Sequence, residues 1–397
     1  MITLFDYQRK SIDDAYFNSI TNNHYGNTIF DFDMGYGKTV CALAYHQKYF
    51  RDKQILVIAP ASVRDAKVWQ KEFERFIGEG EIKVESYAKL AQLKDTKNTF
   101  IIFDECHALK NPVSGRSKNA QKIAQEPTNR FVGLSGTTHP NGWYDIAGYF
   151  VLFGMSKNKT EFYRHYVEQR PARYGKFMEI VGYKRIPQLK KEWKGISIRR
   201  DLEGVRELPE QIFYNVFCET KVDPRASDGK LRKQFGVSFE NIPQKMAYLT
   251  ENAVQDAEKQ LLALLEQGQD MVIFYRLNAE LEKIKATIRK YNPKAKIAFV
   301  NGKQHDNTDG ANYVVAQYTA GSQGLNLQEF RYTVFFAPTY SWQDYVQAVA
   351  RTYRTGQTEK TVFYRFYGGI YDDIWAAIEQ KQDFNFRAFL ATKGEIC

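Results

Sequence analysis

The chain is poor in the residues and patterns that mark several large classes of protein. Its 397 residues include only four cysteines, Cys41, Cys106, Cys218 and Cys397, with no Cys-x-x-Cys pair and no histidine at metal-ligand spacing. This argues against structural zinc and a disulfide framework, and it fits a reducing cytoplasm. No apolar run approaches the ~18 residues that span a bilayer, and the N-terminus lacks the apolar core of a signal peptide. We therefore expect a soluble cytoplasmic protein with no membrane partner.

Acidic residues are also scarce relative to basic ones. The chain has 46 Asp and Glu against 56 Lys and Arg, a formal net charge of +10, and residues 151–200 alone carry a basic surplus of 9. Basic side chains interleaved with Tyr183 and Trp193 suit contact with phosphates and bases. A solvated helical face is the alternative for such a run of charge. The candidate nucleic-acid contacts in this segment are Lys184, Arg185, Lys190, Lys191, Lys194, Arg199 and Arg200.

Short apolar runs rich in Val, Ile and Phe recur along the chain, separated by helical-looking segments. Such alternation predicts parallel sheets with helices on both faces. No comparable run lies between Gly136 and Met271, so we expect two α/β lobes with helical material between them. The predicted strands lie at 27–33, 54–60, 99–105, 130–136, 271–275, 296–302, 312–318, 332–338 and 361–367.

The predicted division of the chain follows from this pattern. We expect an N-terminal lobe at 1–205, including a basic helical insertion at about 151–200. We expect a C-terminal lobe at 206–397, with a helical lead-in at about 225–268 and a brace helix toward the C-terminus.

The stretch DMGYGKT, from Asp33 to Thr39, follows a predicted strand and precedes a predicted helix. Glycines let the backbone wrap closely around a phosphate with its N–H groups turned inward. Lys38 would reach the β and γ phosphates of ATP, and the Thr39 hydroxyl would bind magnesium. The strict phosphate-loop pattern requires a glycine where Phe32 stands, so a plain glycine turn is the alternative. The ATP-binding candidates here are Gly35, Tyr36, Gly37, Lys38 and Thr39.

Two adjacent carboxylates follow the predicted strand at 99–105. Asp104 could hold magnesium, and Glu105 could orient a water molecule for attack on the γ phosphate. The alternative is a pair of acids that merely ends a strand. A phosphate loop and such a strand end in one lobe together predict ATP hydrolysis with magnesium as cofactor.

Gln347, Arg351 and Arg354 are spaced i, i+4 and i+7, which predicts that they share one face of a helix. Arginines that reach a transferring phosphoryl group can contribute ~10³–10⁵ in rate. We therefore take these three residues as catalytic candidates from the C-terminal lobe. A surface arginine pair in ordinary salt bridges is the alternative.

The order of these motifs resembles that of the superfamily-two helicases, and specifically the Swi/Snf-like DNA translocase ATPases. The resemblance covers almost the whole chain. Similar segments are VIAPASVRDAKVWQKEFERF (57–76, motif Ia), DECHALKN (104–111, motif II), LSGTTHPN (134–141, motif III), SIRRDLEGVRELPE (197–210, between the lobes), QDMVIFYRLNAELEKI (motif IV), YTAGSQGLNLQ (318–328, motif V) and WQDYVQAVARTYRTGQTEKTVFYRFY (342–367, motif VI region).

The resemblance implies two RecA-like lobes and a role for several further residues. Gln8 would read the adenine of ATP. Thr319, Gly321 and Ser322 would contact DNA, although loop capping is the alternative for such residues. The residues implied to couple DNA contact to ATP chemistry are His107, Ser135, Thr137 and Gly324.

The resemblance also implies a function: a DNA-dependent ATPase that moves along double-stranded DNA as a monomer, in replication, recombination or fork remodelling. We expect a minimal core of the phage or prokaryotic type. A strand-separating DNA or RNA helicase is a second hypothesis. A non-catalytic DNA-binding scaffold with a decayed ATPase is a third.

Overall fold

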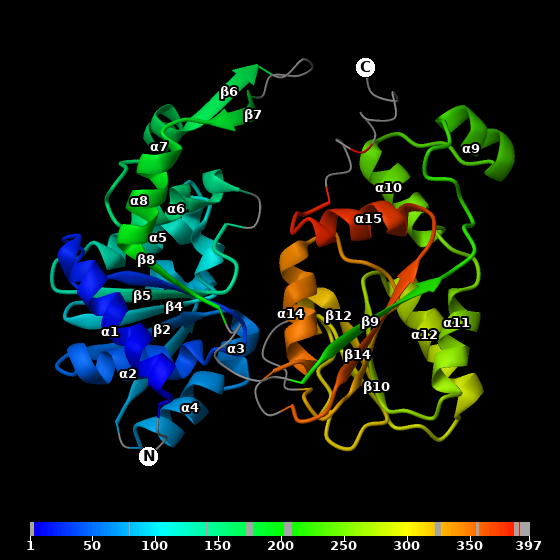
Figure 1. The fold of residues 1–397 in the computed structure, drawn as a ribbon, viewed down its shortest axis with the longest axis horizontal. Helices are drawn as coiled ribbons and strands as arrows, with labels where there is room; N and C mark the ends of the chain where they lie inside the picture. The colour runs from blue at the N-terminus through cyan, green and yellow to red at the C-terminus, as the bar shows by residue number, and fades with distance from the viewer. Residues whose placement is uncertain are drawn as a thin grey trace. The chain divides into compact units, whose positions relative to one another are not determined.

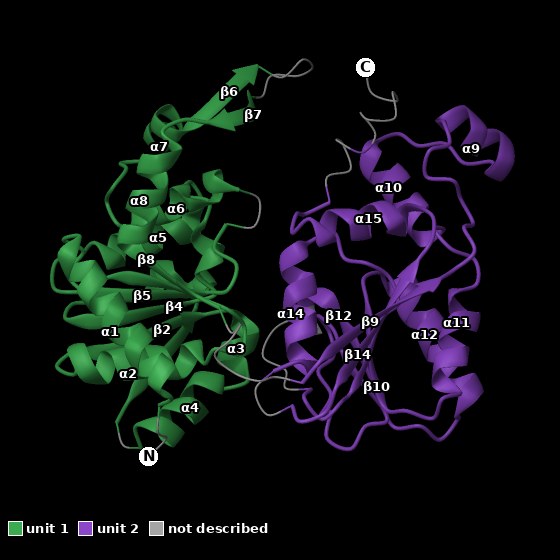
Figure 2. Cartoon of the chain, in the orientation of Figure 1, with its two compact units in different colours: residues 1–207 green, residues 208–397 purple. Residues whose placement is uncertain are grey.

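The structure is a computed structural model that describes residues 4–78, 80–139, 142–171, 178–201, 209–321, 327–354, 357–384 and 389. The chain divides into two compact units, residues 1–207 and 208–397 (Figure 2). Each unit is built around its own six-stranded sheet (Figure 1).

The sheet of unit 1 is parallel throughout, with the strand order β3-β2-β4-β5-β1-β8. Its strands are β1 (Thr28–Phe32), β2 (Gln54–Ala59), β3 (Ile82–Ser86), β4 (Thr99–Asp104), β5 (Arg130–Ser135) and β8 (Ser197–Arg200). Every residue of β1 is buried, as expected for a strand covered on both sides. Because parallel strands end at the same edge, the segments after β1, β4 and β5 meet there.

Helices cover both faces of this sheet. The described helices are α1 (Asp6–Thr21), α2 (Lys38–Tyr49), α3 (Ala61–Asp65), α4 (Val68–Phe76), α5 (Gly115–Ala124), α6 (Ala147–Leu152), α7 (Lys159–Tyr166) and α8 (Ile186–Ile196), with 3-10 turns η1 (Tyr87–Gln92), η2 (Cys106–Leu109) and η3 (Trp143–Ile146). Phe30 and Phe32 of β1 pack in one core with α1, α2 and α4. Ile29, between them, packs in a second core with α5, α6 and α8. Alternate residues of one strand thus bury into opposite helical layers.

The basic segment at 151–200 contains more than helices. After α7 the chain forms an antiparallel hairpin of β6 (Val167–Pro171) and β7 (Met178–Tyr183). We call α7, β6 and β7 the arm; Figure 1 shows it projecting from one end of unit 1. The segment then returns through α8 to β8, which pairs with β1 in the main sheet. The expectation of a helical insertion missed these strands because β6 is polar and almost wholly exposed, so it has no apolar run.

The sheet of unit 2 is also parallel, with the order β11-β12-β10-β13-β14-β9. Its strands are β9 (Gln211–Phe217), β10 (Met271–Tyr275), β11 (Ile297–Val300), β12 (Tyr313–Gln317), β13 (Tyr332–Phe335) and β14 (Thr361–Tyr367). The described helices are α9 (Asp228–Phe235), α10 (Ile242–Glu251), α11 (Ala257–Leu265), α12 (Asn278–Tyr291), α13 (Tyr318–Gly321), α14 (Trp342–Thr352) and α15 (Ile370–Glu379). In Figure 1, α11 and α12 lie on one side of the sheet and α14 lies on the other.

The predicted fold class is confirmed: two α/β lobes, each with a parallel sheet covered by helices. Every strand predicted from an apolar run is present. In the described ranges, no helix combines the length and apolar character needed to cross a bilayer.

Candidate functional site

The predicted phosphate loop connects β1 to α2. Gly35 and Gly37 have φ values of 82° and 88°, in the left-handed region that favours glycine. The Lys38 ammonium donates to the main-chain oxygens of Phe32 and Asp33 at 3.0 and 3.2 Å. The loop therefore curls around its own lysine at the N-terminus of α2, where main-chain N–H groups and the helix dipole favour an anion.

Gln8 of α1 holds this loop from the side. Its Nε2 donates to the main-chain oxygen of Tyr36 at 3.0 Å, and its Oε1 accepts from the Phe5 N–H at 3.1 Å. A Cβ at position 37 would lie 2.5 Å from Gln8 Nε2, so a larger residue there would displace the Gln8 side chain from the loop. The Tyr36 side chain is buried, with its hydroxyl 2.7 Å from Ser11 Oγ. Tyr36 can therefore face a nucleotide only through its main chain, and adenine recognition by Gln8 stays a prediction.

Asp104 is the last residue of β4, and each oxygen of its carboxylate accepts a hydrogen bond. Oδ2 accepts from the indole Nε1 of Trp69 at 2.9 Å, and Oδ1 accepts from the Glu105 N–H at 3.0 Å. The Tyr87 hydroxyl donates to the main-chain oxygen of Asp104 at 2.8 Å. Burial, then the Glu105 charge, raise the pKa of Asp104 to about 6, while the Trp69 hydrogen bond and Lys38 oppose the shift. Trp69 and Tyr87 are site residues that the sequence reasoning missed.

Lys38 and the two carboxylates lie close enough for their charges to act on one another. Burial lowers the pKa of Lys38, and the carboxylates of Glu105 and Asp104 oppose this shift most strongly. The structure thus brings together the loop lysine and the strand-end acids that the sequence placed about seventy residues apart.

Glu105 is connected to the predicted coupling residues by a short polar network. His107 Nδ1 lies 3.2 Å from Glu105 Oε2 and 3.3 Å from Ser135 Oγ. Ser135 Oγ in turn accepts from the Thr137 N–H at 3.1 Å. Three of the four coupling candidates are therefore linked to the carboxylate that would orient water; the fourth, Gly324, lies outside the described residues.

The donor set fits a magnesium–nucleotide complex. Asp104 and Thr39 supply oxygen ligands of the kind magnesium prefers, few enough to leave positions for waters and phosphates. A Cβ at Gly136, after β5, would lie 3.5 Å from Lys38 Nζ and 3.1 Å from the Phe32 oxygen. Glycine at position 136 therefore leaves free the space beside the Lys38 ammonium that a side chain would fill.

Two of the predicted DNA contacts are already paired with acids of unit 1. Arg199 forms ion pairs with Asp31 at 3.1 Å, with Asp33 and with Asp201. Arg200 pairs with Asp14 at 2.5 Å and donates to Ser11 Oγ at 3.1 Å. These guanidinium groups attach β8 to β1 and α1, and their contact with DNA stays a prediction. The other basic candidates, Lys184, Arg185, Lys190, Lys191 and Lys194, are exposed.

The predicted motif V and VI residues lie in unit 2. Thr319 is exposed on α13, whereas Ser322 lies outside the described residues; for Gly321, only its place at the end of α13 is described. Gln347 is buried on α14, and Arg351 follows one turn later.

The placement of Arg354 on the same helix is wrong. The helix ends at Thr352, because Tyr353 adopts an extended backbone, and Gln357 Nε2 donates to the Thr352 oxygen at 3.4 Å. Gln347 and Arg351 therefore share a helical face, and Arg354 lies on the turn that follows.

Asp104→Asn is expected to stabilise the nucleotide-free protein by roughly 1–3 kcal/mol at about pH 8, and not at about pH 3. The folded-state pKa is about 6 against an ordinary 3.8, so ionisation of Asp104 penalises the folded state. That penalty is absent below the unfolded pKa and complete above the folded one. Urea unfolding at both pH values measures it; a variant less stable than wild type at the higher pH would contradict the expectation.

The loop, its lysine and the strand-end carboxylates lie together in one parallel α/β unit, in the arrangement expected of a phosphate-loop nucleotide site, and a second parallel α/β unit follows. Residues 254–356 match the family described as Helicase conserved C-terminal domain. The SWI/SNF-related matrix-associated actin-dependent regulator of chromatin subfamily A-like protein 1 of Drosophila melanogaster is 23% identical over 88% of this chain and 52% of its own length. The protein of the same name from Xenopus tropicalis is 24% identical over 88% of this chain and 42% of its own length.

The chain thus spans about half the length of the curated relatives it matches. Among solved structures, the Sulfolobus solfataricus SWI2/SNF2 ATPase core in complex with dsDNA has a TM-score of 0.45 and 19% identity, covering 99% of this chain and 94% of that one. These matches make the chain similar to Swi/Snf-related proteins over most of its length, and to the helicase C-terminal family over residues 254–356.

Proposed function

We propose that the chain is a DNA-dependent ATPase that translocates on double-stranded DNA as a monomer. The observation that carries the ATPase part is the convergence of Lys38, Asp104 and Glu105 in unit 1. The basic surplus of 9 at 151–200 and the exposed lysines of α8 support DNA as the partner. Replication, recombination or fork remodelling, in the cytoplasm of a phage-infected or prokaryotic cell, is the context that the motif resemblance suggests; the animal relatives give no support for that origin.

In this proposal each residue of the site has one task. Bound magnesium–ATP supplies the phosphoanhydride bond that is cleaved and the metal charge that offsets the phosphates. Main-chain N–H groups from Gly35 to Thr39 bind the phosphates, and the Lys38 ammonium neutralises their charge. The Thr39 hydroxyl and the Asp104 carboxylate would hold the metal. Glu105 accepts a hydrogen bond from the attacking water, and His107 fixes the orientation of that carboxylate.

The residues of unit 2 complete the proposed machinery. Arg351 and Arg354 would stabilise charge on the transferring phosphoryl group, and Gln347 would assist in positioning the water. Thr319, Gly321 and Ser322 would contact the DNA backbone, which positions the protein without reading sequence.

Phosphate release with duplex DNA, single-stranded DNA and RNA, measured side by side, tests this proposal. Stimulation by duplex DNA together with displacement of a triplex-forming strand supports translocation. Strand displacement without triplex displacement would favour a strand-separating helicase instead. If the wild-type chain released no more phosphate than Lys38→Ala, the hypothesis of a non-catalytic DNA-binding scaffold would be favoured.

Trp69→Phe is expected to raise the magnesium concentration needed for half-maximal ATPase by about 10-fold or more, because groups that orient a metal ligand typically contribute 10–100-fold in affinity. Trp69 is fully buried and donates to Asp104 Oδ2, so phenylalanine keeps much of the packing and removes the donor. Tyr87→Phe is the matched control, since it removes a donor to the main chain of Asp104 rather than to its carboxylate. Equal magnesium dependence in the two variants would mean that Trp69 has only a packing role.

Replacing Lys190, Lys191 and Lys194 by Gln should weaken duplex binding and lower its salt dependence, by up to ~0.9 in log–log slope for each phosphate that is no longer neutralised. All three are exposed on α8, so the fold should tolerate the change. Fluorescence anisotropy across a salt series measures the slope. A control triple at Lys71, Lys83 and Lys122, also exposed on unit 1, should leave the slope near wild type. If the slope of the α8 variant were unchanged, Lys190, Lys191 and Lys194 would be a solvent-exposed helical face that does not contact DNA.

A further inference from the structure

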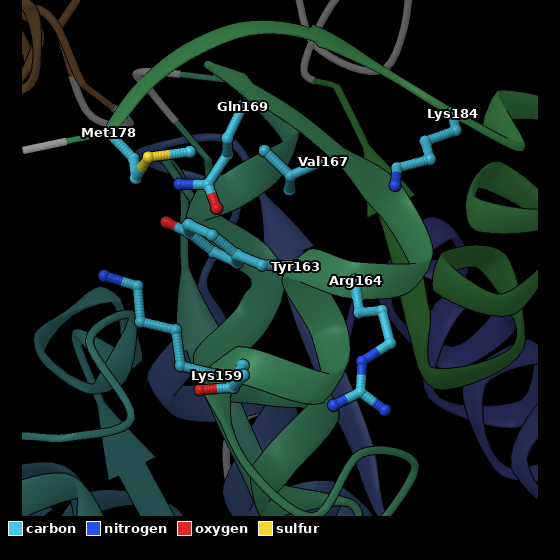
Figure 3. A pocket seen from close by; sticks show the side chains of 8 residues that line it. Lys159, Tyr163, Arg164, Val167, Gln169, Met178 and Lys184 are labelled. Atoms are coloured by element: carbon cyan, nitrogen blue, oxygen red, sulfur yellow. The ribbon is translucent and has the colours of Figure 1, made fainter. Parts of the chain in front are cut away.

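An open pocket that the ATP site does not use lies against the arm. The pocket has a volume of about 610 Å³, inside the range of about 300–1,000 Å³ typical of ligand sites. It opens between α7 and the hairpin of β6 and β7 (Figure 3). We call it the arm pocket; its lining residues are Lys159, Thr160, Tyr163, Arg164, Val167, Gln169, Met178 and Lys184.

The lining of the arm pocket is cationic and contains no acid. Three of the eight residues carry positive charge, Lys159, Arg164 and Lys184, and within the described residues none of them forms an ion pair. Two of the three acids of the arm are engaged elsewhere, and the third, Glu168 on β6, is exposed and does not line the pocket. Glu179 pairs with Arg170 at 3.5 Å, and Glu161 accepts from the Lys157 N–H at 2.5 Å. The pocket therefore concentrates positive charge that nothing in its own lining neutralises, which favours an anionic occupant.

The ring of Tyr163 lies among the three cationic side chains of the arm pocket. In Figure 3, Tyr163 lies between Lys159 on one side and Arg164 and Lys184 on the other. Lys159 Nζ lies 4.9 Å from the centroid of the Tyr163 ring. The Tyr163 side chain is partly buried against the core of unit 1, and Met178 from β7 is 51% exposed beside it (Figure 3). An aromatic ring and a methionine with cationic side chains nearby suit a ligand that has both an aromatic base and phosphates.

The geometry distinguishes between two forms of nucleic acid. A duplex keeps its base faces inside the stack and can offer the pocket only phosphates. An unpaired nucleotide can offer a base to an aromatic platform and its two flanking phosphates to the surrounding cations. The central position of Tyr163 therefore favours the unpaired form, whereas the lysines of α8 need only a backbone.

We propose that the arm pocket binds an unpaired nucleotide of a DNA strand, with the base on Tyr163 and Met178 and the phosphates on Lys159, Arg164 and Lys184. This inference rests on the proposed function for the choice of DNA as the polymer. It adds a second DNA form: the enzyme grips an unpaired strand through the arm while the motor acts on duplex.

Binding of short oligonucleotides to the full chain without ATP tests the inference. Tyr163→Leu is expected to weaken binding of a single strand by about 10-fold through loss of stacking, with duplex binding near wild type. Lys159→Gln combined with Arg164→Gln should lower the single-strand salt slope by up to ~0.7 for each phosphate that is no longer neutralised. A strand carrying 2-aminopurine should lose fluorescence on binding wild type and not on binding Tyr163→Leu. The triple variant at Lys71, Lys83 and Lys122 is the control for a general reduction of positive charge.

Each alternative outcome overturns the inference. An equal loss of duplex and single-strand affinity in the Lys159 and Arg164 variant, with no effect of Tyr163→Leu, would make the pocket a backbone contact only. Tighter binding of an RNA strand than of the same DNA strand would reject DNA as the occupant. Since none of these measurements needs turnover, a failure here is distinct from a failure of the ATPase proposal, which phosphate release with duplex DNA reports. Thermal unfolding of each variant confirms that it folds.

Discussion

Glu105→Gln is expected to abolish ATP turnover while ATP and DNA binding stay near wild type. The amide has the size of the carboxylate but cannot accept a proton, so the loss should be on the order of 10²–10⁴ in rate. The backbone at Glu105 has a φ of 50°, and Oε2 lies 3.2 Å from His107 Nδ1, so the side chain is directed by its turn and its neighbour. Single-turnover phosphate release with a fluorescent phosphate sensor measures the chemical step.

Glu74→Gln, an exposed carboxylate on α4, is the matched control and should leave turnover unchanged. Binding of a fluorescent ATP analogue separates the two roles that a carboxylate at this position could have. If Glu105→Gln lost ATP binding along with turnover, Glu105 would be a metal or nucleotide ligand, and its assigned role in orienting water would be wrong.

Arg351→Ala is expected to lower the duplex-stimulated ATPase rate by about 10³-fold or more, the scale seen when an arginine that stabilises phosphoryl transfer is removed. Arg351 is placed in the last turn of α14, whose inner face is fixed by the buried Gln347. Its main-chain oxygen accepts from the Leu327 N–H at 3.1 Å, a bond that the substitution keeps. Arg351→Lys should recover little, because a lysine cannot make the bidentate contact.

Arg331→Ala is the control for loss of a guanidinium from unit 2. That side chain is half exposed and pairs with Glu359 at 3.7 Å, a surface ion pair expected to contribute little. If Arg351→Ala kept wild-type kcat and changed only thermal stability, Arg351 would be a structural residue of α14, and the catalytic assignment would pass to Arg354 alone.

The parts of this site that the sequence predicted are those that neighbouring residues determine. The loop from Gly35 to Thr39 needs its glycines because of its own backbone angles, and it is formed by a strand, a loop and a helix that follow one another in the sequence. Asp104 and Glu105 were found because they follow a long apolar strand. Since parallel strands end at one edge of a sheet, predicting the fold was enough to bring these groups together.

The parts that the sequence did not predict depend on contacts between distant residues. Arg199 belongs to a basic run, but its partners Asp31 and Asp33 lie on β1 and directly after it, which only the register of β8 beside β1 reveals. Trp69 reads as an apolar residue of an amphipathic helix, and only the fold shows its indole donating to Asp104. The strands β8 and β9 were missed because one is only four residues long and the other is largely exposed.

Phosphate release by the wild-type chain with saturating duplex DNA, compared with Lys38→Ala, tests the central claim most directly. Lys38 is buried among the carboxylates of the site and bonded to the loop that carries it, so its loss should remove phosphate binding. We predict ATPase activity that duplex DNA stimulates in wild type and that Lys38→Ala lacks. Equal phosphate release by the two proteins, with both folded, would contradict the assignment of the loop and the strand-end acids as an ATP-hydrolysing centre.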